Sequence, residues 1–287
     1  MKNKDYFKKA RENQFAIGQF NISNLETLKG VVFAAQNLNS PIIIGTSENE
    51  SKFLGLKETV ALVDYFRKET KLPIFLNLDH GKSFDYIKKA IDCGFDMVSF
   101  DGSVLNLQEN IKITKEIVKF AHSKGVFIEG EFNFITGSSR VLSENPEIKE
   151  TDLTNPEDAE RFAKETGVDS LAVNIGTFHG ISASGINPHI NLQRLKEIEE
   201  RVNNKAFLVL HGGSGTPEED IKEAIKLGIV KININTELRI AFTNALKDSF
   251  VDNPKEVVPY KYLQNSIGTV QKVVENKIKL FGSQNRI

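Results

Sequence analysis

Short apolar runs alternate with helical patterns along almost the whole chain, and this alternation limits the folds that the chain can adopt. The runs that we interpret as strands are residues 15–21, 41–47, 73–80, 97–102, 126–133, 170–176, 206–212 and 229–236. The helical patterns that follow them are residues 24–39, 57–70, 83–93, 106–124, 155–166, 191–203, 217–227 and 237–250. Nearly continuous apolar runs are typical of parallel strands that helices cover on both faces. Eight strands alternating with eight helices predict an α/β protein with the (β/α)8 TIM barrel fold.

A single domain is expected to contain residues 1–287, because no linker or low-complexity tract divides the sequence. A doubly wound open sheet is the alternative architecture, but the sequence contains no Gly-x-Gly-x-x-Gly turn that would support it. Residues 260–287 carry one additional C-terminal helix, which could pack on the barrel or on a partner subunit.

The composition excludes several classes of partner. A formal net charge of −1 over 287 residues argues against binding to nucleic acid or to a membrane surface. Cys93 is the single cysteine, so no intrachain disulfide is possible. No apolar run approaches the roughly 20 residues of a membrane span, and the first residues carry no apolar signal core. We therefore expect a cytoplasmic protein in a reducing compartment, with no nucleic-acid or membrane partner.

Three of the five histidines have the same setting in the sequence. His80, His179 and His211 each stand at or just beyond the C-terminal end of an apolar run, and each is followed by glycine. The C-terminal ends of parallel barrel strands converge on one face, where active sites lie. Three imidazoles brought together there can hold a divalent metal and leave one position open for a substrate. One strand-end histidine would more often be structural, so it is the repetition that predicts a metal site.

Carboxylates stand at the same strand ends. Asp79 precedes His80, where it could exchange a proton with a substrate hydroxyl, or else cap a helix or orient an imidazole. Asp101 ends the fourth run, and Glu129 and Glu131 are two residues apart in the fifth, so they share one face. Asp101 with Glu131 could orient the histidines or offer a second metal position, and a set of caps and salt bridges is the alternative.

A glycine-rich turn predicts an anion site. The segment His211-Gly-Gly-Ser-Gly215 runs from the seventh strand straight into a helix, and glycines let backbone N–H groups close on an anion at a helix N-terminus. Asn233 and Thr236 follow the eighth strand. Because the loops after strands seven and eight often build a phosphate site in this fold, we expect a phosphate to bind here.

Six motifs, taken in order, resemble those of the class II, metal-dependent ketose-bisphosphate aldolases, the group of fructose-1,6-bisphosphate and tagatose-1,6-bisphosphate aldolases. The motifs are Leu78-Asp-His-Gly81, Ser99-Phe-Asp-Gly-Ser103, Glu129-Gly-Glu131, Ile175-Gly-Thr-Phe-His-Gly180, Leu210-His-Gly-Gly-Ser-Gly215 and Lys231-Ile-Asn-Ile-Asn-Thr-Glu237. The resemblance runs from Phe20 to the terminal Leu280-Phe-Gly-Ser, so it covers nearly the whole chain. The ordered set is far more specific than any one of its members.

The resemblance implies a role for each residue of a complete site. It implies a divalent metal, usually zinc, held by His80, His179 and His211, with Asp101 and Glu131 near an alternative buried position, and Asp79 as the acid/base at the C4 hydroxyl. It places the C1 phosphate of the ketose, often with a monovalent cation nearby, at Gly180, Gly212, Ser214, Asn233 and Thr236. It implies substrate contacts at Asn21, Ser47 and Asn235. Arg239 matches a residue that in some members reaches the distal phosphate of a neighbouring subunit's substrate.

The implied reaction is reversible cleavage of a ketose 1,6-bisphosphate to dihydroxyacetone phosphate and glyceraldehyde 3-phosphate. In the family, cleavage of the C3–C4 bond leaves an enediolate of dihydroxyacetone phosphate. The metal stabilises this enediolate as a Lewis acid at the C2 and C3 oxygens. One departure stands out. The family usually carries Gly-Gly-x-Glu-Asp after the fifth strand, and its glutamate is the C3 base, whereas this chain reads Thr136-Gly-Ser-Ser-Arg140.

Several alternatives follow from this departure. Glu144 or Glu147, further along the same loop, could replace the missing base. A phosphosugar- and metal-binding family member with lost or altered aldolase activity is the second functional hypothesis. Asn235 stands where some fructose-type members carry aspartate and some tagatose-type members a small residue, so fructose and tagatose both stay open as substrates. The role implied for Arg239 requires a homodimer or a homotetramer.

Overall fold

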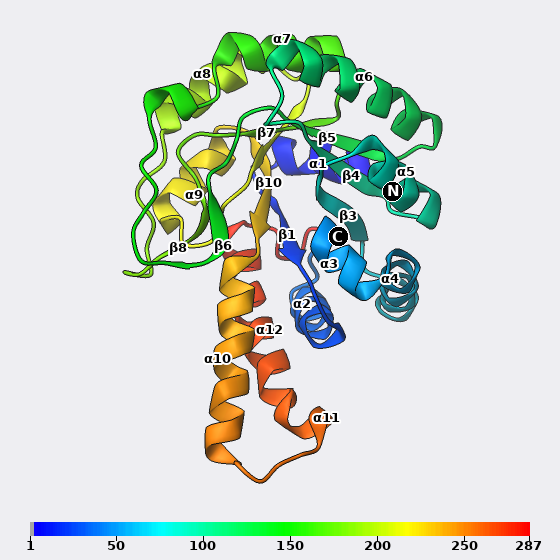
Figure 1. Cartoon of the computed structure of the whole chain (residues 1–287), viewed down its shortest axis with the longest axis vertical. Coiled ribbons are helices and arrows are strands. Elements are labelled where there is room, and N and C mark those ends of the chain that lie inside the picture. The colour runs from blue at the N-terminus through cyan, green and yellow to red at the C-terminus, as the bar shows by residue number, and fades with distance from the viewer. Residues whose placement is uncertain (1–2) are drawn as a thin grey trace.

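The computed structural model describes residues 3–287, and its central element is a closed barrel of eight parallel strands (Figure 1). The strand order around the barrel is β1-β10-β9-β7-β5-β4-β3-β2. The barrel strands are β1 (Ile17–Asn21), β2 (Ile42–Ser47), β3 (Ile74–Gly81), β4 (Met97–Asp101), β5 (Phe127–Glu131), β7 (Ser170–Val173), β9 (Phe207–Leu210) and β10 (Ile229–Ile234). Nearly every residue in them is buried, as expected for strands that helices cover. The predicted (β/α)8 TIM barrel is therefore confirmed.

A helix follows each barrel strand and packs on the outside of the barrel. These helices are α2 (Leu25–Asn37), α4 (Leu56–Thr70), α5 (Phe84–Cys93), α6 (Leu107–Ser123), α7 (Pro156–Thr166), α8 (Leu192–Val202), α9 (Glu218–Lys226) and α10 (Thr236–Asp252). Local sequence explains their ends: Ser83 and Asn155 accept hydrogen bonds from the first turn of α5 and α7, and Gly94 and Gly167 end the same helices with positive φ. The eight predicted helices are all present, with ends shifted by a few residues.

The N-terminal end of the barrel is closed by a helix that the sequence patterns did not predict, α1 (Asn3–Glu12). Phe7 of this helix lies with its ring centroid 4.6 Å from that of Phe127 and 5.5 Å from that of Phe207, which both begin barrel strands. The buried cluster around it also takes Phe75 and Met97 from neighbouring strands. Because α1 fills this end, the opposite, C-terminal end is where the barrel can receive a ligand.

The predicted C-terminal helix is α12 (Gln264–Leu280), and it packs against α2 and α10 of the same chain. Together with the short α11 (Pro259–Tyr262), α10 and α12 form an arm that extends away from the barrel (Figure 1). The tip of this arm, residues 246–263, exposes Phe250, Val251, Val257 and Tyr260. None of the helices among residues 3–287 combines the length and apolarity that a membrane crossing requires.

Three further short elements lie around the open end of the barrel. Helix α3 (Glu48–Leu54) separates β2 from α4, and the 3-10 helix η1 covers Glu150–Asp152. The segment expected as a loop after the fifth strand contains a strand, β6 (Gly137–Leu142), which pairs in parallel with β8 (His179–Ser182). These two strands form a small separate sheet, so the long connections after β5 and β7 hold each other in place.

Candidate active site

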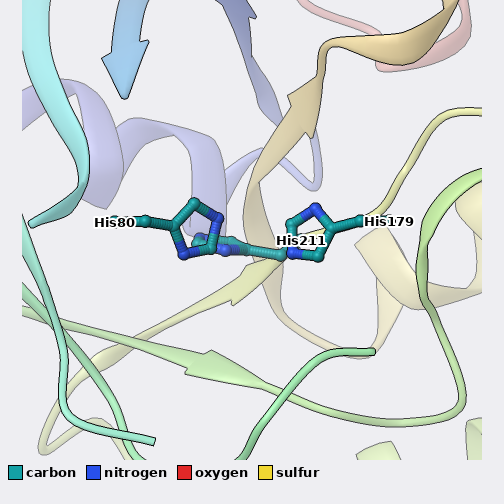
Figure 2. Close-up of side chains that lie close together, drawn as sticks. All are labelled: His80, His179 and His211. Atoms are coloured by element: carbon teal, nitrogen blue, oxygen red, sulfur yellow. The ribbon is translucent and has the colours of Figure 1, made fainter. Parts of the chain in front are cut away.

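The three histidines singled out in the sequence meet at the C-terminal end of the barrel. His80 lies at the end of β3, His179 begins β8 and His211 directly follows β9. Their ring centroids are 4.7 Å apart for His80 and His211, 5.0 Å for His80 and His179, and 6.5 Å for His179 and His211. Figure 2 shows the three rings turned toward one space, and one nitrogen of each lies within 4.8 Å of the others.

Backbone geometry explains how the neighbours Asp79 and His80 both reach the site. The pairing of β3 with β4 shifts register between Leu78 and Gly81, and His80 has a positive φ of 50°. A register shift combined with a left-handed residue turns the strand, so two successive side chains no longer point to opposite faces. His80 therefore has a left-handed backbone conformation that is uncommon for residues other than glycine. This strained residue is itself one of the proposed metal ligands.

A buried chain of charges fixes which nitrogen of His211 faces the other rings. Nε2 of His211 lies 2.9 Å from Oε1 of Glu129, and the Glu129 carboxylate accepts hydrogen bonds of 2.8 and 2.9 Å from Nζ of Lys231. Because a carboxylate only accepts, Nε2 must carry the proton and a neutral ring leaves Nδ1 with its lone pair. Within residues 3–287, the buried Nδ1 has no hydrogen-bond partner.

Glu129 is ionised in this arrangement. Burial by itself raises the pKa of its carboxyl, but the charge of Lys231 and the contact with His211 outweigh burial and hold the pKa well below its usual range. Ser99 and Ser170 add hydroxyl donors at 3.1 Å each. Lys231 is completely buried, and the sequence analysis assigned it no role.

A second set of possible ligands shares His80. Nδ1 of His80 lies 3.0 Å from Oε2 of Glu131 and 3.6 Å from Oδ2 of Asp101, and one ligand atom of each residue falls within 4.8 Å of the other two. Lys82 forms an ion pair with Asp101. Burial raises the pKa of the Asp101 carboxyl, but the hydrogen bonds from His80, Lys82 and Ser103 outweigh burial and lower the pKa strongly. Apart from its contact with His80, the buried Oε2 of Glu131 has no hydrogen-bond partner within the described chain.

His80 and His179, the two histidines that are not fully buried, have pKa values shifted in opposite directions. Burial lowers the pKa of His80, but the charges of Asp79 and Glu131 outweigh it and raise the pKa well above its ordinary value of 6.5. The pKa of His179 is lowered to about 3, first by burial and then by the charges of His80 and His211. With no metal bound, His80 is therefore protonated at neutral pH and His179 is not.

Asp79 is held as a carboxylate beside the histidines. Its Oδ1 accepts a hydrogen bond of 3.0 Å from Nδ2 of Asn233, and its Oδ2 accepts one of 2.9 Å from Nδ2 of Asn21. Burial raises the pKa of Asp79, but His80, His211 and Lys231 outweigh burial and bring it to about 2. Asp79 is the one acidic residue among the described residues that line the cavity next to the histidines.

That cavity has a volume of about 130 Å³ and contains every substrate-binding residue expected from the sequence. Its walls are Asn21, Ser47, Asp79, His80, Ser139, His179, Gly180, Gly212, Ser214, Asn233, Asn235, Thr236 and Arg239. On one side, Gly212 has a φ of +67°, and a Cβ there would come within 2.6 Å of the Phe178 carbonyl oxygen, so only glycine fits. Among residues 3–287, no group accepts a hydrogen bond from the N–H of Gly212 or of Ser214. Unpaired N–H groups beside the N-terminus of α10 make this side suitable for an anion.

Behind the wall of this cavity lies Glu50 of α3, a residue that the sequence patterns did not single out. Its Oε2 accepts hydrogen bonds from Nδ2 of Asn21 at 3.1 Å and from the backbone N–H of Ser47 at 2.8 Å. Its Oε1 accepts from Nη2 of Arg239 at 2.6 Å and from Nδ2 of Asn235 at 3.4 Å. The Ser-x-x-Glu spacing of Ser47 and Glu50 is a capping-box signal, and it was the clue available in the sequence.

The two glutamates considered as replacements for the missing loop base do not line this cavity in the structure. Glu144 is exposed, and Glu147 lines a different cavity of about 380 Å³ with Ser103 and Asn174. The two remaining histidines lie outside the site: His122 pairs with Asp169 and His189 with Asp220, at 2.9 and 3.0 Å.

Known proteins resemble this chain over nearly its whole length. The sequence model of the family described as "Fructose-bisphosphate aldolase class-II" matches residues 1–286. The crystal structure of the YdjI aldolase from Escherichia coli K12 superimposes with a TM-score of 0.82 at 31% sequence identity, and the alignment covers 99% of this chain and 97% of that one. Fructose-bisphosphate aldolase (Fba) from Campylobacter jejuni superimposes with a TM-score of 0.85 at 22% identity, with 100% and 96% covered, which shows a common fold.

Proposed function

The chain belongs to the class II fructose-bisphosphate aldolase family, and we propose that it cleaves a ketose phosphorylated at C1 into dihydroxyacetone phosphate and an aldehyde. The observation that carries the proposal is the position of the three imidazoles beside a cavity that offers unpaired N–H groups to an anion. Fructose 1,6-bisphosphate and tagatose 1,6-bisphosphate, which would release glyceraldehyde 3-phosphate, are the substrates that the sequence predicts.

The donor set fits a divalent metal, and we propose zinc or another divalent ion held by His80, His179 and His211. Two ligands of one tetrahedral zinc are roughly 3.3 Å apart, given bonds of about 2.0 Å, so ligand atoms within 4.8 Å need small adjustments only. The unpartnered Nδ1 of His211 supports this assignment. A bound metal would supply Lewis-acid stabilisation of developing negative charge on substrate oxygens. His80 with Asp101 and Glu131 would form the alternative position.

Asp79 is proposed to take the proton of the C4 hydroxyl during cleavage and to return it during condensation. Its low pKa keeps it ionised at neutral pH, so it can accept a proton. Asn21 and Asn233 hold both carboxylate oxygens, which directs the group at the cavity and prevents it from turning away. Positioning of this kind contributes to rate because the reacting groups are already aligned.

The C1 phosphate is proposed to bind at Gly180, Gly212, Ser214, Asn233 and Thr236, with a monovalent cation nearby. The N–H groups of Gly212 and Ser214 would donate to the phosphate oxygens, and the first turn of α10 begins beside them. Anchoring at C1 would leave the rest of the ketose in the same cavity as His80, His179 and Asp79.

We propose that the protein acts in the cytoplasm as a homodimer or homotetramer. The arm exposes Phe250, Val251, Val257 and Tyr260, which is a concentration of large apolar side chains on one protruding segment. Such patches commonly mark protein–protein contacts. Sedimentation equilibrium of the whole chain tests this, and a monomer at micromolar concentration would contradict it.

A specific observation favours a second function. Residues 136–140 carry no acidic side chain, and neither Glu144 nor Glu147 reaches the cavity. The alternative is therefore a family member that binds metal and phosphosugar but has lost or altered aldol cleavage.

Steady-state turnover separates the two functions. Zinc-loaded protein would be assayed with fructose 1-phosphate, fructose 1,6-bisphosphate and tagatose 1,6-bisphosphate, with dihydroxyacetone phosphate as the measured product and a chelator as control. Chelator-sensitive release from at least one sugar is the expected result. Binding of zinc and dihydroxyacetone phosphate without release from any sugar would favour the second function.

A further inference from the structure

Glu50 is a buried carboxylate behind the wall of the active-site cavity, with no part in the proposed cleavage. It lies in the first turn of α3, directly after β2, and is only 6% exposed. A capping box requires one carboxylate oxygen, and Oε2 meets that requirement at the N–H of Ser47. The other oxygen, Oε1, accepts a hydrogen bond from Arg239 of α10, so the side chain does more than cap the N-terminus of α3.

Glu50 accepts hydrogen bonds from four residues that line the cavity, of which Arg239 also donates from Nη1 to the carbonyl oxygen of Ser139 at 3.3 Å. Asn21, Ser47, Asn235 and Arg239 each direct a donor at its two oxygens. Arg239 is the one lysine or arginine among the described residues that line the active-site cavity, and its charge is matched by Glu50 at 2.6 Å. The contrast with the C1-phosphate side is direct, because there the N–H groups of Gly212 and Ser214 have no acceptor among the same residues.

Glu50 also fixes the orientation of the Asn235 amide. Because a carboxylate only accepts hydrogen bonds, Asn235 must turn its Nδ2 to Glu50, which turns its Oδ1 away. That Oδ1 is buried and has no partner within residues 3–287. This oxygen and the Glu50 carboxylate are both acceptors, so neither can donate a hydrogen bond to a phosphate dianion, which has no proton to donate in return.

The adjoining space is also lined mainly by uncharged groups. A second cavity of about 120 Å³ shares Asn21, Asn235 and Arg239 with the active-site cavity, and Glu50 lies in its wall. The other residues around it are Ser23, Asn24, Thr27, Leu238, Phe242 and Thr243. Hydroxyl and amide side chains of this kind suit a hydroxylated carbon chain, and the Glu50–Arg239 pair adds no net charge.

We propose that Glu50 makes the distal end of the active site a site for uncharged hydroxyl groups, so that the preferred substrate is a ketose phosphorylated at C1 only. This inference rests on the proposed function and narrows its substrate class. Arg239, for which the sequence suggested contact with the distal phosphate of a neighbouring subunit's substrate, is paired here with Glu50. A second phosphate would have to share Arg239 with Glu50 and approach a buried carboxylate of like charge, which disfavours it.

The kinetic test compares fructose 1-phosphate with fructose 1,6-bisphosphate. Wild-type protein should show at least a tenfold higher kcat/KM for the monophosphate. Glu50→Gln keeps a capping-box residue, since Gln also serves at that position, but it removes the charge and frees Arg239. The variant should shift the ratio at least tenfold toward the bisphosphate. Glu48→Gln, which makes the same charge change in the same helix outside both cavities, should leave the ratio unchanged.

The opposite shift would overturn the proposal. If Glu50 instead orients Arg239 for a distal phosphate, wild-type protein prefers the bisphosphate and Glu50→Gln loses that preference. A purely structural role predicts a lower midpoint of thermal unfolding with an unchanged ratio, and this result also overturns the proposal.

A binding measurement keeps the inference separate from cleavage. Calorimetry with zinc-loaded protein would compare D-glucitol 1-phosphate with D-glucitol 1,6-bisphosphate, and we expect at least tenfold tighter binding of the monophosphate. Absence of cleavage of every sugar would defeat the proposed function, and the calorimetry would then decide the inference alone. Equal or tighter binding of the bisphosphate, or no binding of either, would overturn it.

Discussion

The strand ends that hold the histidines and the loop of residues 134–154 lie side by side, yet their polar groups are held very differently. At the strand ends, Glu129 receives hydrogen bonds from Lys231, Ser99 and Ser170 and contacts His211, all in the barrel interior. The loop is mostly exposed, and β6 is held in place by its pairing with β8. The proposed metal site is therefore fixed by many mutually dependent contacts, whereas the loop places no carboxylate in the cavity that could replace the family's C3 base.

Removing one histidine should have the largest effect on this contrast. His211→Ala leaves two imidazoles, which is too few for a tight zinc site, so we expect loss of bound metal and of any cleavage. The metal content after dialysis would be measured by atomic emission, with His189→Ala as control because His189 lies outside the site. Stoichiometric zinc in the His211 variant would contradict the assigned ligand set.

Removing the charge behind His211 should have the next largest effect. Lys231→Met leaves Glu129 as a buried and uncompensated carboxylate, which typically costs about 3–5 kcal/mol of unfolding free energy. Zinc affinity should fall about 10–100-fold, as is usual when the group that orients a ligand is disturbed. Denaturant unfolding and zinc titration measure the two effects. Lys52→Met removes an exposed charge and should change neither; an equally small effect at Lys231 would show that the buried chain does not matter.

Proton release sharpens the same comparison through pH. The raised pKa of His80 means that metal must displace a proton from it at neutral pH, whereas His179, with a pKa of about 3, has none to lose. Zinc affinity should therefore decrease as pH falls below the pKa of His80, by about tenfold per pH unit for each proton displaced. Zinc titration between pH 6 and 7 checks this, and a pH-independent affinity would contradict the titration assigned to His80.

Substitutions in the loop should have the smallest effect. Glu144→Gln and Glu147→Gln change residues outside the active-site cavity, so we expect cleavage rates within about twofold of wild type. Loss of a general base typically lowers the rate by about 10²–10⁴-fold. A loss of that size in either variant would show that the loop delivers a carboxylate to the substrate from another conformation, and the contrast between the two regions would then be weaker.

The parts of the molecule that the sequence predicted are those encoded in local patterns. Periodic apolar runs located the eight strands, and strand-end positions located His80 and His211 because parallel strands converge. His179 was placed just beyond the seventh strand, but its pairing with the loop was missed, since β8 has only four residues and joins a partner about 40 residues away.

Contacts between distant residues could not be predicted. The pair of Glu129 and Lys231 joins residues 102 positions apart across the barrel interior, and nothing near either residue signals the other. Arg239 and Glu50 are 189 positions apart, so the capping signal at Glu50 was visible but its second partner was not. Helix α1 could not be predicted because only Tyr6, Phe7 and Ala10 among its 10 residues are apolar, which is too few for a clear periodic pattern.

Hydrogen exchange at C3 of dihydroxyacetone phosphate tests most directly the central claim that this site performs aldolase chemistry. Zinc-loaded protein would be incubated with dihydroxyacetone phosphate in deuterium oxide and followed by proton NMR, which requires no knowledge of the aldehyde. The account predicts incorporation of one deuterium at C3, abolished by a chelator and strongly slowed in His211→Ala. No exchange by a protein that binds both zinc and dihydroxyacetone phosphate would contradict it, and the site would then be one for binding alone.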